Sequence, residues 1–264
     1  WDWWYYTEKI KKEKYALDDE ITRPYFKIDN VIEGMFYVAN RLYNLTFKVR
    51  NDIPKYHPDV ITYEVTRDGK HIGVLMIDNY PRASKRGGAW CGAMRGQSRD
   101  INGKMITPVV TMVTNSTPPG ADKPSLLTAD EASTLFHEFG HALHQLLSNS
   151  TYPSVSGTSV PRDFVELPSQ IMEHWVLEPE VLQVYAKHYQ TGEVIPAEIV
   201  EKLDKAGKFN TGFTTVEFLA AALLDMEYHT MTEPADIDIR EFEKKALDKY
   251  GLIDEIKPRY RSTY

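Results

Sequence analysis

Two histidines and a glutamate, His137, Glu138 and His141, have the types and spacing of a metal-dependent hydrolytic site. Residues four apart lie one turn apart on the same face of a helix, so both imidazoles can reach one ion. Zinc binds neutral imidazole nitrogens in tetrahedral sites. Glu138 is offset by one position, which lets its carboxylate flank the metal and take a proton from metal-bound water. The motif therefore predicts one Zn²⁺ per chain with Glu138 as general base; the alternative is two ordinary helix histidines.

The spacing leaves the third protein ligand open. A metzincin-type site needs a glycine three residues and a histidine six residues after the second histidine, but His144 and Leu147 stand there. A carboxylate from a following helix remains, and four acidic side chains are candidates: Asp163, Glu166, Glu173 and Glu178. A helix that begins near Asp163 places Glu166 and Glu173 on one face, so spacing alone does not choose between these two.

Two neighbouring side chains are candidates for supporting roles. Glu173, when it is not a ligand, can orient His137 or His141 by accepting the second ring N–H, as metal-bound histidine requires. The alternative for Glu173 is a solvated carboxylate. His144 lies one turn beyond His141, and we expect it behind the ligands or on the helix surface rather than on the metal.

A run of small residues at 87–93 is a candidate substrate-binding strand. Small residues let another backbone approach closely, and an edge strand beside a metal can pair with an extended peptide. We assign the backbone of Ala89 and Cys91 to that role; the alternative is a plain core strand with Trp90 buried. The Cys91 side chain is expected to be a small buried hydrophobe rather than a nucleophile.

The sequence before the motif predicts helices followed by strands. Residues 1–60 have apolar positions at helical spacing and are expected to form a helical entry. Residues 61–114 are expected to form a small antiparallel β-sheet. Asp68-Gly69 between β-branched runs indicates its hairpin, and further strands are expected at 88–94 and 107–113.

The remaining sequence, residues 128–264, is predicted to be the zinc-binding helical region. Thr128 and Glu131 match a capping box that opens the helix of the histidine motif. Pro168 should kink the next helix or confine it to its first turns. Further helices are expected near 197–206, 214–230 and 239–249. We therefore predict one catalytic domain over residues 1–264, mainly α with a small antiparallel β-sheet, which is an α+β fold.

Composition excludes several classes of protein. The 264 residues carry 31 Lys and Arg against 38 Asp and Glu, a formal charge of −7, so no basic excess exists to neutralise nucleic acid. No apolar run is long enough for a transmembrane helix, and no membrane partner is expected. The single cysteine excludes intrachain disulfides and cysteine-based zinc clusters.

The motif and the segment after it resemble the thimet oligopeptidase family of zinc metallopeptidases. The resemblance rests on residues 137–141 followed by Glu166-Leu-Pro-Ser-Gln170. It narrows to bacterial peptidyl-dipeptidases of the Dcp type through residues 1–3, 52–58, 161–163, 173–175 and 221–226, and it covers essentially the whole chain. It implies that Glu166 is the third ligand and that the fold is a zincin-like helical catalytic core beside a deep channel.

The resemblance also implies the activity. Members of the family hydrolyse short peptides, and peptidyl-dipeptidases release dipeptides from the free C-terminus. An endo-acting oligopeptidase of the same family is the nearer alternative, and a metal-bearing or peptide-binding module without catalysis is the alternative from another class. A monomer is the family-like expectation. The cytoplasm fits the cysteine content, and the periplasm stays open.

The resemblance further predicts that this chain is a catalytic core truncated at both ends. It begins at Trp1 without a methionine, and the family's upstream helices are expected before it. A Gly-rich and Tyr-rich loop that binds substrate and the developing oxyanion is expected after Tyr264. Because such donors contribute about 10²–10³ in rate, we expect the isolated chain to be inactive or very weak.

Overall fold

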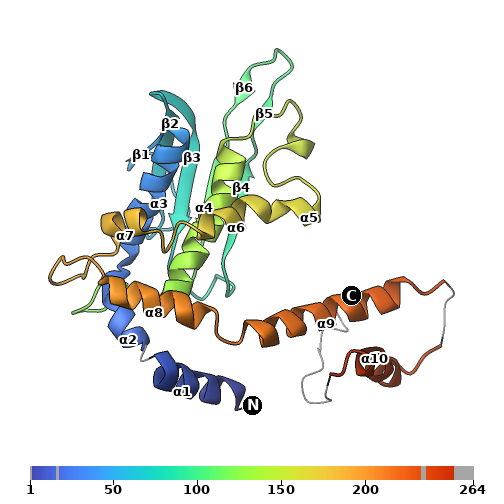
Figure 1. The fold of residues 1–264 in the computed structure, drawn as a ribbon. Coiled ribbons are helices and arrows are strands. Elements are labelled where there is room, and N and C mark those ends of the chain that lie inside the picture. Colours follow the sequence, from blue (N-terminus) through green and yellow to red (C-terminus); the bar gives the residue numbers. More distant parts are fainter. Residues whose placement is uncertain (1, 16–17, 233–235, 253–264) are drawn as a thin grey trace. The chain divides into compact units, whose positions relative to one another are not determined.

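The computed structural model describes residues 2–15, 18–232 and 236–252 (Figure 1). The chain divides into two compact units, residues 1–204 and residues 205–264, and each is described by itself. The expected metal-binding motif lies in the first unit. The description as one catalytic domain over residues 1–264 stays a prediction.

The first unit contains a five-stranded sheet in the order β1-β2-β3-β7-β4. Its strands are β1 (Leu45–Val49), β2 (Ile61–Arg67), β3 (Lys70–Asp78), β4 (Trp90–Arg95) and β7 (Val109–Val113). Between β4 and β7 the chain forms a separate two-stranded sheet of β5 (Ser98–Arg99) and β6 (Met105–Ile106). The α+β class is confirmed.

The predicted antiparallel arrangement of the sheet is wrong at one junction. β3 pairs with β7 in parallel, whereas β1–β2, β2–β3 and β4–β7 are antiparallel. The cause is strand order, because β7 inserts between β3 and β4 after a long connection, and parallel neighbours require such a connection. The pattern of apolar residues predicts strands at 88–94 and 107–113, but it contains no information on the order of the strands in the sheet.

The helical entry is interrupted by a strand that the sequence reading missed. Helices α1 (Trp3–Tyr15), α2 (Asp19–Thr22) and α3 (Ile28–Tyr43) and the 3₁₀ turn η1 (Arg23–Tyr25) are followed directly by β1. Asn44 ends α3 in the left-handed conformation (φ 56°), and Leu45 then starts the pairing with β2. Apolar residues continue through Leu45 and Phe47, so apolar spacing alone predicts that the helix extends over this strand.

The β2–β3 hairpin is confirmed. Both of its turn residues, Asp68 and Gly69, have positive φ (51° and 73°), as a two-residue turn of primed type requires.

Helices α3 and α4 (Ala129–Leu146) pack against one face of the sheet (Figure 1). Phe36 of α3 stacks on Phe47 of β1 at 4.0 Å between centroids, and Phe139 of α4 packs against both rings. The predicted capping box at Thr128 and Glu131 is confirmed, with both reciprocal hydrogen bonds present. This core therefore fixes the helix that carries the histidine motif.

After α4 come the 3₁₀ turn η2 (Pro153–Val155), α5 (Arg162–Val165), α6 (Leu167–Glu173), α7 (Pro179–Tyr185) and α8 (Ala197–Gly207). The predicted break near Pro168 is confirmed, because α5 and α6 are separate helices joined at Glu166 and Pro168 lies in the first turn of α6.

The second unit contains α9 (Thr211–His229) and α10 (Ile239–Asp248), near the predicted positions. Ala220 and Leu224 of α9 and Ala246 and Leu247 of α10 form a small buried cluster of their own. No helix among the described residues of the chain is long and apolar enough to cross a membrane.

Candidate metal centre

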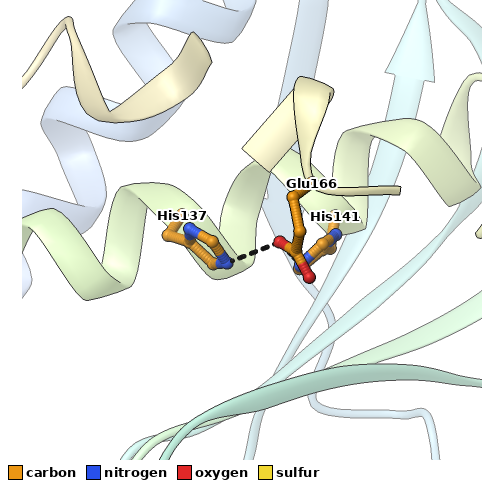
Figure 2. Close-up of side chains that lie close together, drawn as sticks. All are labelled: His137, His141 and Glu166. Carbon is orange, nitrogen blue, oxygen red and sulfur yellow. Dashed lines mark ion pairs between the residues drawn. The ribbon is translucent and has the colours of Figure 1, made fainter. Parts of the chain in front are cut away.

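The two motif histidines point their Nε2 atoms at one carboxylate. Figure 2 shows His137 and His141 one turn apart on α4, with Glu166 reaching them from the α5–α6 junction. Glu166 Oε2 lies 3.1 Å from Nε2 of His137 and 3.1 Å from Nε2 of His141. The imidazole planes are nearly perpendicular, at 84°, so the nitrogens converge from different directions. Of the four candidate carboxylates, the structure brings Glu166 to both imidazoles.

The helix break at the α5–α6 junction gives Glu166 this position. Glu166 ends α5 and immediately precedes α6, and from this junction its side chain reaches across to the two histidines of α4. Gly140, between the two histidines, permits the close crossing. A Cβ at Gly140 would lie 2.5 Å from the carbonyl oxygen of Pro168 and 2.6 Å from Cα of Ser169.

Glu173 lies on the other side of the His137 ring. Its Oε1 accepts a hydrogen bond of 2.6 Å from His137 Nδ1. With the proton held on Nδ1, the lone pair of a neutral imidazole is on Nε2 and points at Glu166. Two electron-rich atoms then face each other at 3.1 Å, an arrangement that a shared proton or a cation stabilises.

Glu138 has a different environment from the acids around it. It is buried, with 6% of its surface exposed, and its Oε2 has no hydrogen-bond partner among the described residues. Burial raises the pKa of Glu138 to about 7, with His137 opposing the rise and the Glu166 carboxylate adding to it. A carboxyl group tuned to this range can exchange a proton near neutral pH.

The donor set fits a zinc ion. The ligand atoms of His137, His141 and Glu166 all lie within 4.8 Å of one another, and two histidines with one glutamate are a ligand set of catalytic zinc. A hydrogen bond from Ser169 helps to hold the pKa of Glu166 below its usual range, and burial lowers the pKa of His141. Both shifts favour the unprotonated forms that bind metal.

The other candidates lie apart from this group. Asp163 is in the first turn of α5 and Glu178 precedes α7, and neither belongs to the cluster of ligand atoms. His144 faces Phe164, with 6.3 Å between ring centroids, and burial lowers the pKa of its imidazole.

The small-residue strand borders the metal centre. Ala89 and Cys91 line a cavity of about 450 Å³ together with the histidine motif and Glu166. β4 is the last strand in the sheet order, so one of its edges has no partner strand among the described residues. Cys91 Sγ accepts a hydrogen bond from Gln145, and burial raises the pKa of its thiol, which keeps it a poor nucleophile.

Sequence reasoning missed two contributors to the site. Ser169 is fully buried and donates a 2.8 Å hydrogen bond to Glu166 Oε2. The spacing of three residues from Glu166 is the sequence signal for this contact. Thr158 lines the same cavity as the ligands although it lies in a loop, where periodicity gives no signal.

Comparisons with known proteins cover the whole chain. The model of peptidase family M3 matches residues 1–264. The chain is 46% identical to the dipeptidyl carboxypeptidase of Salmonella typhimurium, over all of the chain and 39% of the relative's length. It is 41% identical to oligopeptidase A of Escherichia coli, over 89% of the chain and 35% of that protein. The chain thus spans about two fifths of the length of these curated relatives.

Proposed function

The chain belongs to peptidase family M3, and from this premise we propose that it is the zinc-binding core of a peptidase that hydrolyses short peptides. The observation that carries the proposal is the position of the Glu166 carboxylate, 3.1 Å from both motif imidazoles, with the buried Glu138 in the same cavity.

His137, His141 and Glu166 would hold one Zn²⁺. When bound, the ion supplies Lewis-acid polarisation of the scissile carbonyl and acidifies the attacking water. Glu173 orients His137 through Nδ1 and keeps its Nε2 free for the ion.

Glu138 is the general base of this proposal. Its carboxylate takes a proton from the attacking water and passes it to the leaving amine. Its lack of another hydrogen-bond partner among the described residues leaves Oε2 available for that proton. The backbone of Ala89 and Cys91, at the start of the free edge of β4, pairs with the extended peptide and presents it to this group.

Release of C-terminal dipeptides is the favoured specificity. The support is the name of the Salmonella typhimurium relative, a dipeptidyl carboxypeptidase that matches the full chain. Oligopeptidase A, whose matched segment is shorter, supports an oligopeptidase as the alternative. A non-catalytic metal- or peptide-binding module has no need of Glu138. We further propose a monomer in the cytoplasm.

Zinc content and one substitution test the proposal. Elemental analysis of the chain purified without chelator should give about one zinc per chain, and Glu138→Gln should keep it. In a peptide-cleaving polypeptide that contains this chain, Glu138→Gln should abolish cleavage, and product masses should show a C-terminal dipeptide ladder. Loss of zinc in Glu138→Gln would make Glu138 a ligand and overturn the assignment of roles.

A further inference from the structure

The edge strand β4 separates two cavities. Cys91 of β4 and Ala89, the residue just before the strand, face α4, since both line the metal-site cavity and Cys91 contacts Gln145 of α4. Successive side chains of a strand point to opposite faces. Trp90 and Gly92, which are paired with Val113 and Thr111, therefore face the other side of the sheet.

That other side contains a cavity of about 720 Å³. Apolar and aromatic residues form much of its lining, namely Tyr56, Trp90, Ala93, Met94 and Val113, together with Gly92 and Thr111. Trp90 is 50% exposed, and its indole lies against Gly92, where an added Cβ would be 3.2 Å from the ring. The absence of a side chain at Gly92 thus lets the indole form one wall of the cavity.

Basic side chains border the same cavity. Arg82 and Lys85 form ion pairs with the buried Asp78 carboxylate. Arg86 also borders the cavity, and among the described residues its guanidinium has no carboxylate partner. Three cations against one anion leave this cavity positively charged, which disfavours a cationic occupant.

The two cavities meet at Trp90, which lines both. A peptide paired along the free edge of β4 would also alternate its side chains between the two faces of the sheet. If one side chain points to the metal side, the next points to the Trp90 side. The cavity is thus continuous with the place where the peptide backbone would lie.

We propose that the Trp90 cavity is a substrate subsite that accepts an aromatic or large apolar side chain of the bound peptide and rejects lysine or arginine. The inference rests on the proposed function, because it requires the extended peptide along β4. It adds a selectivity to that function: every second side chain of the peptide contacts Trp90, and the side chains between them face the metal centre.

Peptide binding to the zinc-loaded Glu138→Gln variant of a peptide-cleaving polypeptide that contains this chain tests the subsite. The probes are alanine-based hexapeptides in which Phe or Lys replaces one position at a time, and NMR titration gives each dissociation constant. Phe should tighten binding about fivefold to tenfold at positions that alternate along the peptide, and Lys should weaken binding there. Trp90→Ala should remove the gain at those positions alone, whereas Trp3→Ala, an exposed tryptophan of α1, should leave the profile unchanged.

The outcomes separate the subsite from the proposed function. Two results would overturn the subsite alone. In the first, peptides bind to the zinc-loaded protein but the effect of Phe does not alternate along the peptide. In the second, Trp90→Ala weakens binding equally for Phe at every position. Peptides that fail to bind to that zinc-loaded polypeptide would overturn both. Zinc stoichiometry measured on the same sample tests the metal site independently of the peptides.

Discussion

The Glu166 carboxylate is the most exposed of the proposed ligands, with 48% of its side chain accessible, so its orientation depends on a further contact. Ser169 provides it, through the 2.8 Å hydrogen bond to Oε2 from a fully buried hydroxyl. Ser169→Ala removes this donor and should weaken zinc binding by about 10–100-fold. Competition with a chelator of known affinity measures the change. Ser154→Ala, in the exposed 153–155 turn, is the matched control, and equal zinc affinities in both variants would contradict the role of Ser169.

The contact between Glu173 and His137 makes a second prediction at the residue scale. Glu173→Ala removes the acceptor for His137 Nδ1, so the ring loses its fixed tautomer and zinc affinity should fall about tenfold or more. Glu173→Gln retains an acceptor oxygen without the charge and should give an intermediate affinity. The same chelator competition measures both. Asp163→Asn, which lies outside the ligand cluster, should bind zinc as the parent does; a comparable loss there would point to a general charge effect.

The crossing of α4 and α6 makes the corresponding prediction at the scale of elements. Gly140→Ala introduces a Cβ that would meet Pro168 O at 2.5 Å and Ser169 Cα at 2.6 Å, and both are backbone atoms that cannot rotate away. The helices must separate, so stability should fall by about 1–3 kcal/mol and zinc affinity should fall with it. Urea unfolding and zinc titration measure the two effects.

The matched control for Gly140→Ala is Gly212→Ala, near the start of α9, where an added Cβ meets nothing within 4 Å. That variant should be neutral or slightly stabilising, because alanine restricts the unfolded chain. A Gly140→Ala protein with unchanged stability and zinc affinity would show that the crossing does not position Glu166.

The elements also show how far the sequence predicts this fold. The capping box and the apolar stripe predict α4, and the Asp68-Gly69 turn predicts the hairpin, because both signals are local. The parallel β3–β7 pairing and the strand β1 escape prediction, since each is decided by a partner distant in sequence. Spacing gives the two histidines but leaves Glu166 and Glu173 equivalent. Only the junction at Glu166 turns one carboxylate towards Nε2 and leaves the other at Nδ1.

At the scale of the whole first unit, a buried ionic cluster joins segments that are distant in the chain. The Asp78 carboxylate at the end of β3 accepts hydrogen bonds from Arg82, Lys85 and the Tyr56 hydroxyl. Lys85 Nζ also donates to the Thr114 carbonyl, just after β7. The cluster therefore ties the loop before β4 to the centre of the sheet, and with it the start of the strand that borders the metal centre.

This cluster makes stability depend on pH. Burial alone would raise the pKa of Asp78, but the hydrogen bonds from Arg82 and Lys85 outweigh it and hold the pKa below its usual value. The folded pKa is thus below the unfolded value of about 4, so the carboxylate stabilises the fold above that pH and the contribution is lost as pH falls through the folded pKa. Asp78→Asn leaves the buried Lys85 without its anion and should cost about 3 kcal/mol near neutral pH.

Urea unfolding at about pH 6 and about pH 3 measures the difference between the two proteins. The parent should lose more stability than Asp78→Asn over this range, so the gap between them should narrow in acid. Asp130→Asn, an exposed aspartate in the first turn of α4, should retain the parent's pH dependence. Parallel curves for the parent and Asp78→Asn would mean that another carboxylate governs acid stability.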